Sequence, residues 1–274
     1  MLYTFNWNKA DDPFKQGLFR NKTFRQAMSH LTDREALIDL VVGSGEPAYA
    51  PMSSAYTSWY SDDFPVFAYD PEAALALLAE IGFTETNDDG WLVDANGNVL
   101  EFDLATIASN DRAMSTIQII TDGMREAGVK AEPVGLEFSV LVDQLTAEGP
   151  ERPFDAIYIF FGCCSEEWPF FDGIYQCSGQ FHMWTGPGGE CASGEEQRIN
   201  DLVTQGRTIL DDAVAQQISA EILKSFSELQ PMIFTTWAGI HNSWNVNVGG
   251  EFPADLVSTL NGPRDFNYSF KADE

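Results

Sequence analysis

The chain has 274 residues, of which 44% are hydrophobic and 13% are aromatic, enough apolar material for a sizeable core and too much for a disordered segment. Its 42 acidic and 15 basic residues give a net charge of −27, and so negative a surface repels nucleic acids and anionic lipid headgroups. No nucleic-acid partner is therefore expected. The acidic residues are spread along the whole chain, which is typical of a solubilising surface rather than of one cation site.

Targeting signals are not visible in the sequence. No run of about eighteen apolar residues predicts a membrane-spanning helix. The first residues, MLYTFNWNKADDP, have neither the basic start nor the apolar stretch of a signal peptide. We therefore interpret Met1 as the start of a fragment, so that the missing signal says little about the parent protein.

Apolar residues recur with helical or strand spacing along most of the chain. Helices are predicted in two stretches between residues 21 and 42, and over residues 71–82, 110–128, 138–145, 195–210 and 212–229. Strands are predicted over residues 91–93, 99–105, 129–136, 154–161 and 232–237. Strands that alternate with helices over most of the length indicate an α/β layered domain.

Local signals predict one helix cap and one hairpin. Thr32 and Glu35 have the spacing of a capping box, in which Thr32 accepts from the backbone N–H of residue 35 and Glu35 reaches back. Residues 91–93 and 99–105 are separated by the turn Asp94–Asn98 and predict a β-hairpin.

Catalytic signatures are scarce. The sequence contains no G-x-S-x-G elbow, no P-loop, no G-x-G-x-x-G after a strand and no H-E-x-x-H helix. Its three histidines, His30, His182 and His241, suggest capping or packing roles more readily than catalytic ones. We therefore expect no catalytic residue and no cofactor, and interpret the chain as a protein that is not an enzyme.

Four cysteines fall within one long loop: Cys163, Cys164, Cys177 and Cys191. A bond between neighbouring Cys163 and Cys164 would be strained, so disulfides are expected to join that pair to Cys177 and Cys191 in one of two ways. Such disulfides imply an oxidising compartment. One alternative is a zinc site with His182, although the spacing lacks the usual C-x2-C pairs. Another is a thiol nucleophile that uses His182 as its base. No metal site is predicted.

The segment GCCSEEWPFF, residues 162–171, follows a strand that is predicted to be buried on both faces. Ligands of open α/β sheets bind beyond the carboxyl ends of the strands. Here Glu166 and Glu167 stand beside Trp168 and Phe170, and carboxylates within an aromatic wall can hold an ammonium group. The alternative is an ordinary loop whose aromatic side chains pack on the core.

Three stretches carry a resemblance to a known family: FRNKTFRQAMSHLTDREALIDLVVGSGEPAYAPM, YDPEAALALLAEIGF and FDAIYIFFG. In this order and spacing they resemble family 5 of the extracellular solute-binding proteins, which includes oligopeptide, dipeptide and nickel binders. The third stretch is similar to the strand that precedes the family's ligand loop. The resemblance covers nearly all of residues 5–250.

The resemblance implies a mixed-sheet α/β lobe of the type II periplasmic-binding-protein fold. Residues 1–250 are expected to form the second, ligand-grasping lobe, and residues 251–274 a tail that returns towards a first lobe absent from this sequence. The implied partners are that first lobe, a peptide or other small solute, and an ABC permease in the membrane. The implied protein is a monomer in the periplasm or on the cell surface, where it is free or lipid-anchored. A sugar ligand, or an interaction domain without any ligand, is the alternative.

The resemblance also implies an anchor for the ligand. In peptide binders of the family, an Asp in this loop pairs with the N-terminal ammonium group of the ligand. Counting from Gly162 gives this role to Glu166, whereas counting back from Pro169 gives it to Glu167. The predicted ligand-binding residues are Glu166, Glu167, Trp168, Cys164 and Phe170.

Overall fold

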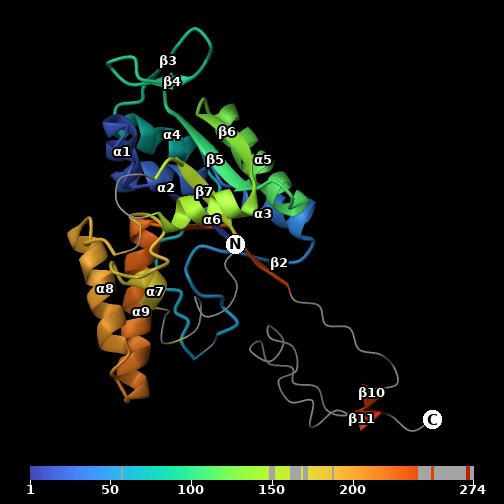
Figure 1. The fold of residues 1–274 in the computed structure, drawn as a ribbon, viewed down its shortest axis with the longest axis vertical. Coiled ribbons are helices and arrows are strands. Elements are labelled where there is room, and N and C mark those ends of the chain that lie inside the picture. The colour runs from blue at the N-terminus through green and yellow to red at the C-terminus, as the bar shows by residue number, and fades with distance from the viewer. Residues whose placement is uncertain are drawn as a thin grey trace.

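A computed structural model of the protein describes residues 1–56, 58–147, 152–160, 168, 172–186, 188–239, 248–249 and 270–271. A five-stranded sheet in the order β6-β5-β7-β1-β8 forms its centre (Figure 1). The strands are β1 (Leu2–Phe5), β5 (Glu101–Ile107), β6 (Lys130–Leu136), β7 (Ala156–Ile159) and β8 (Ile233–Phe234). β5 runs parallel to β6 and β7, while β1 runs antiparallel to β7 and β8. This mixed sheet confirms the predicted α/β class.

Two crossover helices cover opposite faces of the sheet. α5 (Asp111–Glu126) connects β5 to β6, and α6 (Phe138–Thr146) connects β6 back across β5 to β7. Both crossovers join parallel strands and are expected to be right-handed, but they move in opposite directions along the sheet, so their helices lie on different faces. Because side chains alternate along a strand, Phe102 and Leu104 of β5 share one face, and Asp103 and Ala105 share the other.

The remaining helices pack around this layer (Figure 1). They are α1 (Pro13–Arg20), α2 (Lys22–His30), α3 (Arg34–Leu37), the π-helix η1 (Ile38–Val42), α4 (Pro71–Glu80), α7 (Asp172–Tyr175), α8 (Gly194–Gly206) and α9 (Asp212–Leu229). α8 and α9 form a packed pair, drawn in orange. None of the helices that the structure describes has both the length and the apolarity needed to cross a membrane.

A cluster of phenylalanine rings joins the sheet to the N-terminal helices. The Phe5 ring of β1 lies edge-on to Phe24 of α2, with a centroid distance of 4.9 Å, and to Phe102 of β5, at 5.0 Å. Phe19 of α1 completes the cluster, and all four rings are buried. Truncating such a ring to alanine typically costs about 3–5 kcal/mol, so this contact is a main source of stability.

Two buried arginines fasten the N-terminal helices to the C-terminal part of the domain. Arg25 donates to the carbonyl oxygen of Leu229 at 2.8 Å, and its guanidinium group lies 4.0 Å from the Trp7 ring centroid. Arg34 donates to the carbonyl oxygen of Phe234 at 2.9 Å. Burial lowers the pKa of Arg25 to about 9 and that of Arg34 to about 10, so both remain charged at neutral pH.

The predicted helices are confirmed, but one cap lies a residue later than expected. Asp33, not Thr32, is the N-cap of α3, because its carboxylate accepts from the backbone N–H of Ala36 at 2.9 Å. The Thr32 hydroxyl instead donates to the carbonyl oxygen of Met28 in α2, also at 2.9 Å. Thr32 is fully buried in the joint between the two helices, so its hydroxyl is used there.

Three small sheets lie outside the central one. Their strand pairs are β2 (Gly45–Pro47) with β9 (Thr236–Ala238), β3 (Glu85–Thr86) with β4 (Leu92–Val93), and β10 (Val248–Gly249) with β11 (Phe270–Lys271). The predicted strand over residues 232–237 is thus divided between β8 and β9, which belong to different sheets.

The predicted hairpin between residues 91–93 and 99–105 is confirmed only next to its turn. Val93 and Val99 form one antiparallel bridge, flanked by backbone hydrogen bonds from Leu100 to Leu92 and from Asp94 to Asn98. The strand partner of β4 is β3. The Asp94 carboxylate accepts the backbone N–H groups of Asn96 and Asn98, which closes a compact turn as predicted. Buried side chains on both faces of β5 suit the interior of a parallel sheet better than an exposed hairpin.

Candidate functional site

The carboxyl end of β7 leads into the segment that the sequence predicts to bind the ligand. β7 is the middle strand of the central sheet, and three of its four residues are buried. The following residues 161–167 and 169–171 lie outside the described residues, as do Cys163 and His241. Four predicted ligand-binding residues are therefore not placed: Glu166, Glu167, Cys164 and Phe170.

Trp168 is the predicted site residue that the structure describes. Its ring is half-buried and stacks on the ring of Trp59, with a centroid distance of 5.5 Å and an interplanar angle of 23°. The far edge of the ring lies against Gly206 at the end of α8, where even a methyl group would overlap it. The Trp59 carbonyl oxygen accepts from Ser219 of α9 at 2.8 Å. Two stacked tryptophans thus form an aromatic wall against the α8–α9 pair.

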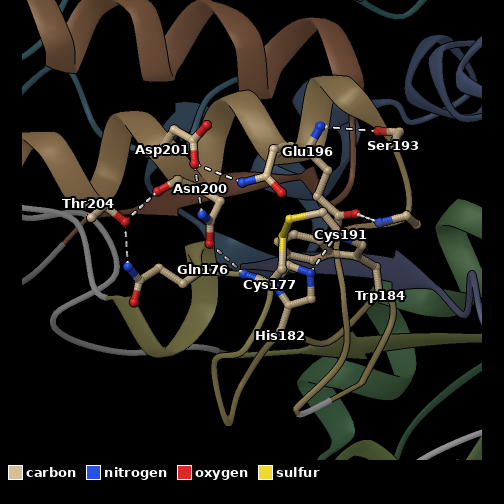
Figure 2. Close-up of a disulfide and its surroundings, with 12 residues drawn as sticks. Gln176, Cys177, His182, Trp184, Cys191, Ser193, Glu196, Asn200, Asp201 and Thr204 are labelled. Atoms are coloured by element: carbon tan, nitrogen blue, oxygen red, sulfur yellow. Dashed lines mark hydrogen bonds and ion pairs between the residues drawn. A yellow bond between two sulfur atoms is a disulfide. The ribbon is translucent and has the colours of Figure 1, made fainter.

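A disulfide follows the predicted ligand segment. Cys177, just after α7, is bonded to Cys191, just before α8, and their Cα atoms are 5.1 Å apart (Figure 2). The backbone N–H of Cys177 also donates to the side chain of Asn200 in α8. The bond therefore fastens the chain that leaves segment 161–171 to the start of α8.

This disulfide confirms that Cys177 and Cys191 are oxidised and corrects the predicted pairing. The sequence argument assumed that all four cysteines form bonds and excluded a bond between Cys163 and Cys164, which left Cys177 and Cys191 to pair with those two. The structure joins Cys177 to Cys191 directly, because α7 and the start of α8 bring their Cα atoms within normal disulfide range.

A buried ion pair lies beside the disulfide (Figure 2). The His182 Nε2 atom is 2.7 Å from Oε1 of Glu196, and its Nδ1 atom is 2.8 Å from the carbonyl oxygen of Ile174. The relative exposure of both His182 and Glu196 is at most 1%. Both ring nitrogens of His182 therefore face acceptor oxygens, one of the Ile174 carbonyl group and one of the Glu196 carboxylate.

The Glu196 carboxylate is held by further donors. The Trp184 indole N–H and the backbone N–H of Ala192 both donate to it, and the Trp184 ring packs against His182 with a centroid distance of 3.9 Å. Burial by itself raises the pKa of Glu196, but His182 and these N–H donors outweigh burial and lower that pKa. Glu196 is therefore a stable buried anion that organises the loop between the two cysteines.

The same geometry disfavours the zinc and thiol alternatives among the described residues. The candidate metal-ligating atoms of Cys177, Cys191 and Glu196 lie within 4.8 Å of one another, but both sulfur atoms are already bonded in the disulfide. Both ring nitrogens of His182 are engaged, so His182 is not available as a zinc ligand or as the base of a thiol nucleophile.

The sequence did not predict the roles of Glu196 and Trp59 in this region. Ser193 and Glu196 have the spacing of a capping box, and Ser193 does accept from the backbone N–H of Glu196 at 3.1 Å. That signal locates the start of α8 but does not predict that the Glu196 side chain turns inward to His182. Trp59 carries no motif, and its contact with Trp168 exists only because the chain folds back.

Comparison with known proteins identifies the family. The sequence profile described as bacterial extracellular solute-binding proteins, family 5 Middle, matches residues 1–177. The chain belongs to this family. Family 5 comprises solute-binding proteins and is not a class of enzymes, and its members act outside the cytoplasm.

Relatives and solved structures agree with this assignment. A probable ABC transporter-binding protein of Deinococcus radiodurans is 35% identical in an alignment of 266 positions that covers 92% of this chain and 45% of that protein. The structure of the oligopeptide-binding protein AppA from Bacillus subtilis, in complex with a nonapeptide, aligns with a TM-score of 0.72 at 23% identity over 99% of this chain and 50% of that chain. The periplasmic binding protein MelB from Agrobacterium fabrum, in complex with stachyose, aligns with a TM-score of 0.73 at 21% identity over 86% of this chain and 37% of that chain.

These likenesses establish the type II periplasmic-binding-protein fold for this family 5 chain. The chain spans about half the length of the curated relatives it matches.

Proposed function

We propose that this chain is part of the solute-binding component of an ABC importer. The intact protein captures a solute outside the cytoplasm, most directly a peptide, and delivers it to a membrane permease without chemical change. The observation that carries the proposal is membership of family 5, together with a relative described as an ABC transporter-binding protein. The solute closes the two lobes around itself, and the closed form docks on the permease.

The proposed anchor for a peptide is the carboxylate of Glu166 or Glu167, which pairs with the N-terminal ammonium group. Trp168, with Cys164 and Phe170, lines the same site. The stacking of Trp168 on Trp59 supports this role, because an aromatic wall next to a carboxylate favours an ammonium group. Segment 161–171 also follows a central strand at its carboxyl end, where ligands of α/β sheets bind.

The proposed organisation assigns residues 1–250 to the second lobe and residues 251–274 to a tail that returns to the first lobe. The Met1 backbone lies beside the end of the central sheet, because its carbonyl oxygen accepts from the backbone N–H of Thr235 at 2.9 Å. Two connections that leave a lobe side by side make a hinge, and this adjacency supports one here. The intact protein is proposed to act as a monomer.

The proposed location is the periplasm or the cell surface, where the protein is free or lipid-anchored. The Cys177–Cys191 disulfide supports an oxidising compartment of this kind.

A thermal-shift panel with the intact protein tests the proposal. Di- to nonapeptides are expected to raise the melting temperature, because a solute that binds only the folded state stabilises it. Sugars such as stachyose serve as the competing class. A shift with sugars alone would retain solute capture and refute the peptide class. No shift with any solute would favour an interaction domain instead.

A further inference from the structure

A second hollow lies at the opposite end of β7 from segment 161–171. It is a pocket of about 430 Å³ between β5, β6, α6, the residues that lead into β7 and the turn between β1 and α1. This is the sheet face that α6 covers (Figure 1). The residues of this chain segment that line the pocket, Pro153 to Asp155, precede β7, and the described lining includes neither Trp168 nor Trp59. Its volume falls within the range of small-molecule sites.

Asp155 and two lysines form the floor of the pocket. The relative exposure of Asp155 is 6% and that of Lys9 is 7%. Lys15 Nζ lies 2.6 Å from the Asp155 carboxylate, and Lys9 Nζ lies 3.4 Å from it. Lys9 also donates to the carbonyl oxygen of Pro153 at 2.6 Å. The Asp155 charge is therefore neutralised within the protein, and the floor is fixed before any ligand arrives.

Asp103 differs from Asp155 because its carboxylate is not neutralised. Asp103 and Asp155 are neighbours on adjacent strands of the same face, and the backbone N–H of Asp103 donates to the Asp155 carboxylate at 3.2 Å. The Asp103 side chain itself makes no hydrogen bond or ion pair with the described residues. Asp103 is exposed at the surface of the pocket, and desolvation and then the Asp155 charge raise its pKa. A positive group beside Asp103 would offset the repulsion from Asp155.

The rest of the lining fits an alkyl chain with a cationic head. Ala105, Val134, Leu136 and Phe154 supply an apolar wall beside Asp103. Asp11 and Asp12 also line the pocket, so its four aspartates and two lysines give a net charge of −2. This local potential, within a chain of net charge −27, attracts cations and repels anions.

We propose that this pocket binds a small organic cation, whose ammonium or guanidinium group pairs with Asp103 while its alkyl part packs on Ala105, Val134 and Leu136. The site is additional to the proposed peptide site, because the described residues that line it include neither Trp168 nor Trp59.

Calorimetric titration of the protein with putrescine, a four-carbon diamine, tests the pocket. Saturable binding is expected, and Asp103→Asn is expected to weaken it at least about tenfold through loss of a charge-assisted pair. Asp39→Asn makes the same substitution at an exposed aspartate outside the pocket and is expected to leave the affinity unchanged. Because the Asp103 side chain has no bonded partner among the described residues, its variant is expected to fold, which circular dichroism verifies.

Two further titrations separate the pocket from other sites. The double variant Glu166→Gln/Glu167→Gln is expected to bind putrescine as the parent does, whereas loss of binding there would move the cation to segment 161–171 and overturn the proposal. Glutarate, a small dianion, is expected not to bind. Glutarate binding in place of putrescine, no putrescine binding, or full binding by Asp103→Asn would each refute the site.

Discussion

Glu196 shows at the residue scale how one buried carboxylate organises a loop. Its partners are His182 and Trp184, which lie between the two bonded cysteines, and Ala192, which directly follows Cys191. A charge at 1% exposure is stable only while its donors are in place, so the loop and the start of α8 depend on each other.

The first prediction concerns removal of that charge. Glu196→Gln removes the buried charge to which His182, Trp184 and Ala192 are bonded, and breaking a buried pair in this way typically costs about 3–5 kcal/mol. Urea unfolding measures the loss. The neighbouring Glu195→Gln is the control, because Glu195 is exposed and pairs with Lys22 at the surface, where a pair contributes about 1 kcal/mol or less. Equal losses of unfolding free energy in the two variants would contradict a larger contribution from the buried pair.

The second prediction is the pH dependence of the same pair. The lowered pKa of Glu196 means that its stabilising contribution is present above the unfolded-state value of about 4.3 and is lost as the pH falls through the folded-state pKa. The difference in unfolding free energy between the parent and Glu196→Gln is therefore expected to be full at pH 7 and to shrink at pH 3. A difference that stays constant between these pH values would contradict the charge argument.

The third prediction concerns the contact between Trp168 and α8. In Gly206→Ala the added methyl group overlaps the Trp168 ring, and overpacking of this kind costs about 1–3 kcal/mol. The near-UV circular dichroism of the stacked tryptophans is expected to change with it. Gly194→Ala, at the other end of α8, meets open space and is expected to be neutral or stabilising by up to about 1 kcal/mol. Identical spectra for the two variants would contradict the stacking.

At the scale of elements, the disulfide is the fourth prediction. Cys177 and Cys191 are 14 residues apart, and closing a loop of about 15 residues stabilises a fold by about 3 kcal/mol. Cys177→Ser/Cys191→Ser is expected to lose an amount of this order in urea unfolding. Cys163→Ser/Cys164→Ser is the matched control and is expected to lose less. Non-reducing peptide mapping that links Cys177 to Cys163 or Cys164 would contradict the pairing.

Elements with local signals are the ones that the sequence predicts well. α5 is an example, because Asn110 caps its first turn and Gly128, with a φ of +84°, follows its last. The hairpin prediction holds only next to the turn at Asp94, because that turn is local, whereas the choice of β3 as the partner of β4 is not. The disulfide pairing failed for a similar reason, since it depends on how α7 meets α8.

In the candidate site, too, local features are predicted and contacts between distant residues are not. The position of segment 161–171 after a buried strand is visible in the sequence, and β7 is confirmed as that strand. Trp59 beside Trp168, Glu196 beside His182, and Lys15 beside Asp155 are contacts between distant parts of the chain. No spacing rule predicts such pairs, because each partner comes from a different element.

At the scale of the whole molecule, the chain combines a mixed sheet with a net charge of −27 that is spread along the sequence. This charge keeps the surface soluble and repels anions, and the proposed carboxylate anchor is of the same sign. The α8–α9 pair, the tryptophan wall and the disulfide hold the chain on either side of segment 161–171.

The most direct test is calorimetric titration of the intact protein with one peptide in two forms, with a free N-terminus and with an acetylated one. We expect acetylation to weaken binding at least about tenfold, because it removes the ammonium group from its carboxylate. We also expect Glu166→Gln or Glu167→Gln to remove this difference, which identifies the anchor. Equal affinity for both forms, in the parent and in both variants, would contradict the carboxylate anchor.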